Sequence, residues 1–513
     1  MKMNFSVARA LRDLICLAGL WAALASAPVT SAQPTNFPHT LADLRTQLDA
    51  RLNEPRFSGA TWSVKAVSLT TGKTVYEQHA DRLMSPASNS KLYTGALALS
   101  TLGGDYQIKT PVYATIRPDD FGRVNGDVIV SGRADPSWKA GTNFWDNFTP
   151  FIAILTNMDI RRITGDLVMD TTFLHGPPSG GGWTVDDLED SDGAEISALT
   201  LEDNTAQIRA TPGAAVGDPC AFTIVQPDTG ITLVNRTKTV AHNGDAILEV
   251  RKLPGTKTFY IFGQLALGAK VEILDEPVPE PAAWFGAALK EALIKNGIAV
   301  DGNVRCIAWP ETPAWSETSL VKLGEVKSPA LRELVRGFMK PSQNLETDLI
   351  FEHVGELSRT ANAPTWRTSE SLALRALDKF LAAKKIPADV HFDEGSGLSR
   401  NNLTSAQATV ALLQMMAAGH SAQDYYNALP IAGVDGTLRR RMKGTPAFQN
   451  VRAKTGTLRW ANSLSGHVTT AGGEKLVFSL MLNRYATSAE VSHTAELDYI
   501  AELLAGFTGR SDE

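Results

Sequence analysis

The amino-acid sequence predicts an α+β protein in which one domain is interrupted by a long β-rich insertion. Alternating apolar residues predict strands near both ends of the chain, at 61–78 and 462–483. Helical spacing dominates residues 328–418, whereas residues 108–320 contain short alternating runs separated by glycine and aspartate turns. Strands early and late, with helices between them, indicate a single α+β domain, and the middle third is the insertion.

The first 32 residues have the pattern of a secretory signal peptide. A basic start precedes an apolar stretch at 14–25, and small residues then lead to a cleavage site after Ala32. The apolar stretch is shorter than the ~20 residues that a membrane-spanning helix needs. We therefore expect export to the periplasm, with no transmembrane anchor after removal of the signal.

Composition and charge exclude several classes of function. The chain has 513 residues, of which 43% are hydrophobic and 20% charged, as is typical of globular proteins with sizeable cores. Its formal net charge of −6 gives no general attraction to nucleic acid, and the basic run at 438–443 is equally well explained as a solvated face.

No cofactor or metal is expected. The nine histidines never lie within four residues of one another, so the chain has no helical zinc motif of the His-x-x-x-His type. Cys220 and Cys306 remain after signal removal, in an oxidising compartment. A disulfide between them and a pair of free thiols are both open at this stage.

The first part of the chain predicts a helix, a hairpin and a second helix. Residues 41–52 have helical spacing, and residues 61–78 form a hairpin with Thr71 and Gly72 in its turn. Ser85 is placed as the N-cap of the next helix and Pro86 as its first residue. The apolar stripe of that helix consists of Leu92, Ala96 and Leu99.

The remaining elements follow in order. The clearest strands of the insertion are at 126–132, 165–170, 246–250 and 258–265, and a helix follows at 285–295. Ser328 and Pro329 repeat the pattern of N-cap and first helical residue. Later helices are predicted at 345–358, 368–384 and 404–418, before strands at 462–470 and 474–483 and a last helix with Leu497, Ile500, Leu503 and Leu504 on one side.

Ser88 and Lys91 form a candidate catalytic pair. A serine is a poor nucleophile until a neighbouring base takes its proton, and a lysine three residues later lies on the same helix face. Lys91 can act as that base only when it is neutral, which requires burial or another nearby positive charge. The spacing alone is a weak signal, because Ser319 and Lys322 repeat it where little room is left for a helix.

Two further motifs support the pair. In "PSQN", Ser342 could relay protons and Asn344 could hold a substrate carbonyl through its amide. In "RAKTGTL", Gly456 lets a substrate lie against the backbone of a strand. Beside this glycine, Lys454 offers a positive charge to an anionic substrate, and two hydroxyls could bind a carboxylate, those of Thr455 and Thr457.

The order Ser-x-x-Lys, Ser-x-Asn, Lys-Thr-Gly is the three-part signature of penicillin-binding proteins and serine β-lactamases. Ser399-Arg-Asn401 is a second copy of the middle motif, whereas Lys-Thr-Gly occurs once in the chain. The sequence resembles the D-alanyl-D-alanine carboxypeptidase/endopeptidase family of class C low-molecular-mass penicillin-binding proteins, the penicillin-binding protein 4 type (peptidase family S13). Five stretches resemble the family in the same order: "MSPASNSKLYT" at 84–94, "ALTLEDN" at 198–204, "GSGLSRNNLT" at 395–404, "LPIAGVDGTLRRRM" at 429–442 and "VRAKTGTL" at 451–458.

The resemblance implies a penicillin-binding, β-lactamase-like domain, in which helices flank an antiparallel sheet and β-rich accessory domains are inserted. The domains then expected are a signal peptide at 1–32, the first part of the catalytic domain at 33–108, the inserted domains at 109–320 and the second part of the catalytic domain at 321–513.

Position by position, the resemblance also implies roles. Ser88 is the nucleophile that becomes acylated, Lys91 is its general base, and Ser342 passes the proton toward the leaving amine. Asn344 orients the peptide of the substrate. The terminal carboxylate is received along the Lys-Thr-Gly strand by Lys454, Thr455 and Thr457, with Gly456 between them, and the backbone N–H groups of Ser88 and Thr457 form the oxyanion hole.

The implied activity is that of a serine-type D-Ala-D-Ala carboxypeptidase or DD-endopeptidase. Its substrates are peptidoglycan stem peptides that end in D-Ala-D-Ala or are cross-linked, and β-lactam antibiotics act as covalent inhibitors. Two alternatives are a serine β-lactamase and a catalytically silent penicillin-binding cell-wall protein.

The sequence departs from the family pattern at three places. Gly132-Arg-Ala-Asp135-Pro136 replaces Gly-x-Gly-Asp-Pro in the insertion, where we expect no effect on the chemistry. Glu394-Gly-Ser-Gly397 replaces Asp-Gly-Ser-Gly, and the Ala-Glu pair expected after Asn344 is Thr347-Asp348. The latter two departures could alter substrate preference near the cleft.

Overall fold

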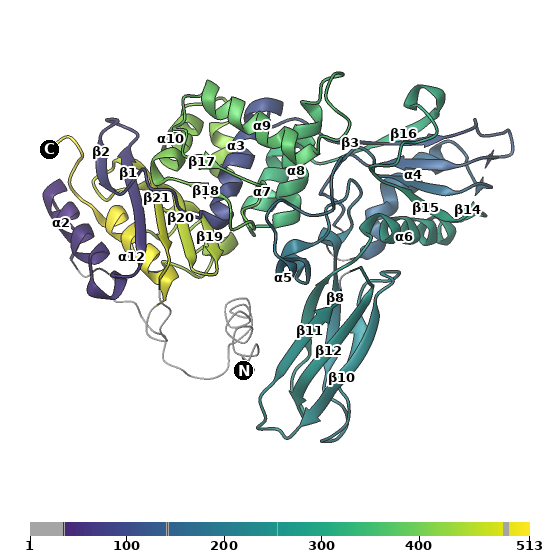
Figure 1. The fold of residues 1–513 in the computed structure, drawn as a ribbon, viewed down its shortest axis with the longest axis horizontal. Coiled ribbons are helices and arrows are strands. Elements are labelled where there is room, and N and C mark those ends of the chain that lie inside the picture. The colour runs from purple at the N-terminus through teal and green to yellow at the C-terminus, as the bar shows by residue number, and fades with distance from the viewer. Residues whose placement is uncertain (1–33, 35, 140, 142, 254, 486–491) are drawn as a thin grey trace. The chain divides into compact units, whose positions relative to one another are not determined.

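The computed structural model describes residues 34, 36–139, 141, 143–253, 255–485 and 492–513 (Figure 1). The signal peptide expected at 1–32 lies outside these residues. They form two compact units. The first runs up to residue 87 and also contains residues 404–410 and 431–513, and the second comprises residues 88–403 and 411–430. The domain boundaries expected from the sequence remain a prediction.

The first unit is built on a five-stranded antiparallel sheet with the strand order β19-β20-β21-β1-β2. Strands from the beginning and the end of the chain share this sheet, because β1 pairs with β21 along its whole length. The strands are β1 (Thr61–Ser68), β2 (Thr74–Gln78), β19 (Arg452–Leu458), β20 (Ala461–Thr469) and β21 (Lys475–Asn483). The predicted hairpin is confirmed, and Gly72 lies in its turn with a φ of 74°.

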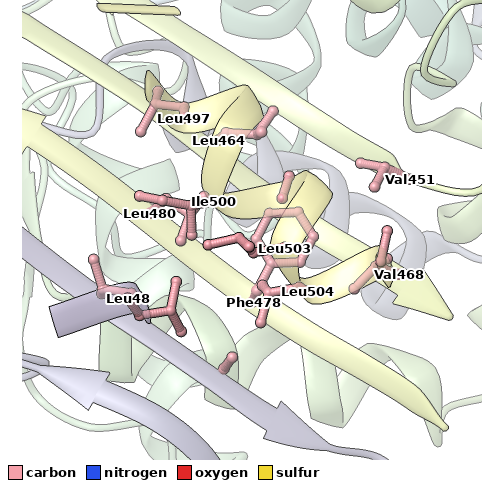
Figure 2. Packing of buried hydrophobic residues seen from close by; sticks show 14 of the residues in the cluster. Leu48, Val451, Leu464, Val468, Phe478, Leu480, Leu497, Ile500, Leu503 and Leu504 are labelled. Carbon is pink, nitrogen blue, oxygen red and sulfur yellow. The ribbon is translucent and has the colours of Figure 1, made fainter. Parts of the chain in front are cut away.

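Two helices pack on this sheet and bury its apolar face (Figure 2). They are α2 (Leu41–Leu52) and α12 (His493–Gly506), and the bounds of α2 agree with the prediction. The helix side of the core contains Leu48, Leu497, Ile500, Leu503 and Leu504, all 0–1% exposed. Burial of each such side chain contributes about 1.5–3 kcal/mol to the free energy of unfolding, so this core fixes the sheet rigidly.

The helices of the second unit surround α3, which is buried over most of its length. The predicted stripe of Leu92, Ala96 and Leu99 is confirmed as core, at 0–1% exposed. The elements of this part are α3 (Ser90–Leu102), α7 (Leu331–Met339), α8 (Asn344–Leu357), α9 (Ser369–Ala383), α11 (Ala422–Ala428), the short strand β17 (Val390–His391) and two elements shared with the first unit, β18 (Leu403–Thr404) and α10 (Ala406–Ala417). The helices predicted at 345–358, 368–384 and 404–418 correspond to α8, α9 and α10.

The β-rich middle of the chain also belongs to the second unit. Its largest sheet has the order β15-β7-β5-β3-β16, and three smaller sheets have the orders β10-β12-β11, β13-β8-β9 and β14-β6-β4. Strands β3 and β16 pair antiparallel, so residues 109–114 and 321–327 lie side by side. The elements are β3 (Lys109–Ala114), β4 (Arg123–Val124), β5 (Val128–Ser131), α4 (Thr149–Asn157), β6 (Arg162–Ile163), β7 (Leu167–Asp170), α5 (Val185–Leu188), β8 (Thr205–Thr211), β9 (Ala221–Ile224), β10 (Thr232–Val240), β11 (Ile247–Lys252), β12 (Thr258–Ala266), β13 (Glu272–Pro277), α6 (Pro281–Lys295), β14 (Ala299–Val300), β15 (Val304–Ile307) and β16 (Val321–Lys327).

Two predicted helix starts are wrong. Helix α3 begins at Ser90 after a 3₁₀ turn, η3 (Ala87–Asn89), and the side chain of Asn483 bonds the backbone of Ser85 instead. Helix α7 begins at Leu331, because the hydroxyl of Ser328 accepts a hydrogen bond from the N–H of Ile108. At Ser328 a partner distant in the sequence engages the hydroxyl that was expected to cap the helix. At Ser85 the distant partner bonds only the backbone, and the hydroxyl has no hydrogen-bond partner among the described residues.

Cys220 and Cys306 are free thiols, the first buried and the second exposed, which is the second of the two alternatives left open by the sequence.

Over the described residues, no helix combines the length and the apolar character needed to cross a membrane.

Candidate active site

The candidate nucleophile and its base meet at the start of α3. Ser88 lies in η3 and is half-buried, whereas Lys91, the second residue of α3, is fully buried. Lys91 Nζ donates a hydrogen bond to Ser88 Oγ at 3.1 Å. The preceding residue, Ala87, has a φ of 49°, a left-handed backbone conformation that costs energy for a residue with a Cβ.

Two further acceptors surround the ammonium group of Lys91. Its Nζ donates to Asn344 Oδ1 and to the backbone carbonyl of Ser396, both at 2.6 Å. Together with Ser88 Oγ these acceptors match the three donors of a charged lysine. The side chain is therefore held in one place, with Ser88 Oγ as one of its fixed partners.

The surroundings of Lys91 lower the pKa of its ammonium group toward neutral pH. Burial lowers the pKa of its ammonium to about 8, against the opposing negative charges of Asp348, Glu394 and Asp192, which raise it. A lysine with this pKa is partly deprotonated near neutral pH. It can therefore act as a general base toward Ser88.

The acidic residues beside Lys91 are themselves held by a short loop. Asp348 on α8 accepts a hydrogen bond from the N–H of Gly395 at 3.0 Å, and burial raises the pKa of its carboxyl well above the usual range. Glu394 accepts from the N–H groups of Ser396 and Gly397, each at 2.8 Å. The two departures near the expected cleft thus lie around the base. The loop also presents the Ser396 carbonyl to Lys91, a contact that no sequence motif indicated.

The Ser-x-Asn motif enters at the start of α8. Asn344 is the first residue of this helix and is buried, while Ser342, two residues earlier, is half-buried with a φ of 73°. The Asn344 amide faces two partners, because Nδ2 donates to the backbone carbonyl of Asp192 at 3.0 Å while Oδ1 accepts from Lys91. Asp192 belongs to the middle of the chain, and sequence reasoning did not identify it.

The Lys-Thr-Gly motif lies on β19, in the first unit. This strand is at the edge of its sheet, and Ile431 forms an isolated antiparallel bridge with its first residue, Arg452. Beyond that bridge, the edge of the strand can pair with an extended peptide. Lys454 is fully buried and donates from Nζ to the carbonyl of Thr455 at 2.8 Å. Thr455 Oγ1 bonds Thr437 Oγ1 at 2.8 Å, and the exposed Thr457 bonds Asn462 Oδ1 at 3.1 Å.

The repeated motif copies have different surroundings. Ser319 Oγ donates to the carbonyl of Ser316 at 2.7 Å, and Lys322 forms an exposed ion pair with Glu325 at 2.7 Å. Ser319 ends a 3₁₀ turn and Lys322 lies in β16, so the spacing that places Ser88 beside Lys91 has no such effect here.

The second Ser-x-Asn copy, Ser399-Arg-Asn401, forms hydrogen bonds with residues of its own loop. Asn401 Nδ2 bonds Asp393 Oδ2 at 2.8 Å, and the N–H of Asn401 bonds Ser399 Oγ at 3.2 Å.

Within the described part of the chain, no cluster of three or more histidine, cysteine, aspartate or glutamate side chains could hold a metal ion.

Comparisons with known proteins agree on one family. Residues 44–504 match the model of the D-Ala-D-Ala carboxypeptidase 3 (S13) family. The chain is 33% identical over 481 residues to a D-alanyl-D-alanine carboxypeptidase of Actinomadura sp., a match that covers 91% of this chain and 86% of that protein. It is 26% identical over 438 residues to the D-alanyl-D-alanine carboxypeptidase DacB of Haemophilus influenzae, covering 84% of this chain and 86% of that protein.

A solved structure agrees with these relatives. The crystal structure of penicillin binding protein 4 (dacB) from Haemophilus influenzae matches with a TM-score of 0.75 and 25% identity, and the match covers 90% of this chain and 97% of that one. The chain therefore belongs to the D-Ala-D-Ala carboxypeptidase 3 (S13) family and is a serine-type D-Ala-D-Ala carboxypeptidase.

Proposed function

We propose that the protein hydrolyses peptidoglycan stem peptides through an acyl-enzyme on Ser88, and that penicillin inhibits it by forming a stable ester with the same hydroxyl. The observation that carries this proposal is the fully buried Lys91, whose Nζ lies 3.1 Å from Ser88 Oγ. Burial favours the neutral amine, and the hydrogen bond places it where it can take the proton of the serine.

The reaction proceeds in two steps. Neutral Lys91 takes the proton of Ser88 while Oγ attacks the carbonyl carbon of the penultimate D-alanine. The peptide bond then breaks: Lys91 gives its proton to Ser342 as Ser342 gives its own to the leaving amine, so both residues return to their starting forms and an ester to Ser88 remains. Water hydrolyses this ester, releases the shortened peptide and restores the serine.

The substrate is held by groups from both motifs downstream of Ser88. Asn344 orients the peptide through its amide, and Lys454, Thr455 and Thr457 receive the terminal carboxylate of a substrate that lies along Gly456 on β19. The N–H groups of Ser88 and Thr457 stabilise the oxyanion, and loss of one such donor typically costs ~10²–10³ in rate. The edge position of β19 supports this proposal, since an extended peptide can pair with the strand beyond the bridge between Arg452 and Ile431.

The same chemistry accommodates two substrates. In a carboxypeptidase reaction the leaving group is a free D-alanine, whereas in an endopeptidase reaction it is the side-chain amine of a neighbouring stem. We propose both activities, because the bond that breaks follows a D-alanine in each case.

The proposed organisation follows the family. Residues 33–108 and 321–513 form the catalytic domain, residues 109–320 are inserted accessory domains, and residues 1–32 direct export to the periplasm. The basic, apolar and small-residue order at the N-terminus supports the last point.

Chromatography of defined substrates tests the proposal. Wild-type protein should release D-alanine from a soluble pentapeptide and should cleave a cross-linked dimer. The Ser88→Ala variant should do neither, although its circular dichroism spectrum should show that its fold is unchanged. Release by the Ser88→Ala variant would refute the role of this serine. Turnover of penicillin to its hydrolysed form, faster than release of D-alanine, would favour a β-lactamase instead.

A further inference from the structure

Asn344 is held from the β-rich middle of the chain. A 3₁₀ turn, η5 (Ser191–Gly193), presents the carbonyl of Asp192 to Asn344 Nδ2 at 3.0 Å. On the other side, Asn344 Oδ1 accepts from Lys91 Nζ at 2.6 Å. The amide therefore bridges the base of the reaction and a segment more than 150 positions away in the sequence.

These two partners fix which way the amide points. A side-chain amide has an oxygen that only accepts and a nitrogen that only donates. Rotation by half a turn would set the nitrogen against the Lys91 donors and the oxygen against the Asp192 carbonyl, so both hydrogen bonds would become repulsive contacts. In the observed orientation one N–H of Nδ2 is engaged by Asp192 and the second can meet a substrate carbonyl.

The same helix turn has a second link to the middle of the chain. Lys139 forms ion pairs with Glu346 and with Asp203, the latter at 3.0 Å. Glu346 is nearly buried and lies in the first turn of α8, two residues after Asn344. This charge-assisted link anchors the backbone from which Asn344 extends.

Apolar packing adds a third link. Leu345 and Leu349 of α8 share one hydrophobic cluster with five residues of the middle of the chain, Ala134, Leu174, Ala194, Ile196 and Ala198. Ala194 follows η5 directly, and Ile196 comes two residues later. The turn that carries the Asp192 carbonyl is therefore packed against the helix that carries Asn344, and this packing fixes the position of the turn.

We infer that the inserted part of the chain is a component of the acylation site, with η5 as a positioning element that fixes the side-chain amide of Asn344 for Lys91 and for the substrate. This inference rests on the proposed acyl-enzyme function. It assigns to the insertion a direct effect on the rate of acylation, in addition to any role in binding.

Gly193→Ala tests the inference without touching a reacting group. A Cβ at Gly193 would lie 2.2 Å from the carbonyl oxygen of Asp187 and 2.7 Å from its carbonyl carbon. These are backbone atoms, which cannot move aside by changing a rotamer, so η5 must shift. Gly141→Ala is the matched control, because among the described residues nothing lies within 4 Å of a Cβ added there.

The measurement is the second-order rate constant for acylation by penicillin, followed by intact mass. We expect Gly193→Ala to lower it about tenfold, the factor that corresponds to loss of one well-formed hydrogen bond, and Gly141→Ala to leave it unchanged. In an Asn344→Ala background the same Gly193→Ala substitution should change the rate less than about twofold, because the group through which η5 acts is gone.

An equal loss in both backgrounds would overturn the inference, since η5 would then act through the fold and not through Asn344. An unchanged rate in Gly193→Ala would overturn it as well. If Gly193→Ala fails to fold, Asp190→Ala takes its place, because the Asp190 side chain caps η5 by accepting from the N–H of Asp192 at 3.1 Å. The effect of Asp190→Ala is then compared between the wild-type and Asn344→Ala backgrounds, with the same expected result. Failure of the wild-type protein to form any adduct would refute the proposed function itself, and is thereby distinguished from failure of the inference.

Discussion

Acylation of Ser88 should accelerate as the pH rises, with half of its maximum near pH 8. The cause is Lys91, whose pKa is lowered to about 8 by burial, with Asp348, Glu394 and Asp192 opposing that shift. Only the neutral amine can take the proton of Ser88, and the neutral fraction increases as the pH passes upward through the pKa. The rate should therefore fall on the acid side and reach a plateau on the alkaline side.

The size of the effect follows from the pKa. With a pKa of about 8, roughly 9% of the protein carries a neutral Lys91 at pH 7 and roughly 91% at pH 9, so the rate should rise about tenfold between these values. A lysine with its ordinary pKa would be neutral in only about 0.03% of molecules at pH 7. Burial in α3 thus supplies about 300 times more of the active form at that pH.

Stopped-flow measurement of acylation by a fluorescent penicillin, between pH 6 and pH 9.5, gives this profile for the free enzyme. Asp192→Asn should move the midpoint to lower pH, since it removes a negative charge that raises the pKa of Lys91 while keeping the backbone carbonyl. Asp186→Asn is the matched control, because Asp186 is also exposed and lies six residues earlier, and it should leave the midpoint in place. A midpoint near the ordinary lysine value, or a rate that does not change with pH, would refute the role of Lys91 as base.

Three further outcomes are expected. Lys454→Ala should lower D-alanine release from a pentapeptide roughly ten- to hundredfold, as expected for loss of one charge-assisted hydrogen bond; unaffected release would contradict the carboxylate role. Ser319→Ala and Lys322→Ala should leave both D-alanine release and penicillin acylation within about twofold of wild type, and a large loss would show that the second Ser-x-x-Lys copy contributes. Leu480→Ala should lower the free energy of unfolding by about 2–5 kcal/mol in urea titrations, because this side chain is 0% exposed in the core of the first unit; a change below about 0.5 kcal/mol would contradict that packing.

Much of the fold could be predicted because its pattern is local. Helix α2 has the predicted bounds, and the hairpin has its glycine in the turn, since apolar periodicity and turn chemistry act over a few residues. The starts of α3 and α7 were wrong for the opposite reason. Asn483 bonds the backbone of Ser85, and the N–H of Ile108 bonds the hydroxyl of Ser328. Each partner is far in the sequence from the helix start concerned, so local capping rules do not anticipate either contact.

The candidate site was predictable where side chains carry its chemistry. Ser88, Lys91 and Asn344 were grouped by motif order, and the structure joins them by hydrogen bonds. The carbonyls of Asp192 and Ser396 could not be found in this way, because a backbone carbonyl is present at every residue and only the fold selects one.

The acidic residues beside Lys91 are an intermediate case. Asp348 and Glu394 stood out as departures from the family pattern, but their place around the base emerged only with the loop at 394–397 and its hydrogen bonds. The departures in sequence thus drew attention to these residues without indicating that they lie around Lys91.

The acyl-enzyme mechanism requires a covalent bond between penicillin and Ser88 Oγ, and intact-mass measurement followed by peptide mapping tests for that bond most directly. The wild-type protein should gain the mass of one penicillin on the peptide that contains Ser88, and Ser88→Ala should gain none. An adduct that persists in Ser88→Ala, or one that maps to another serine such as Ser319, would contradict the assignment.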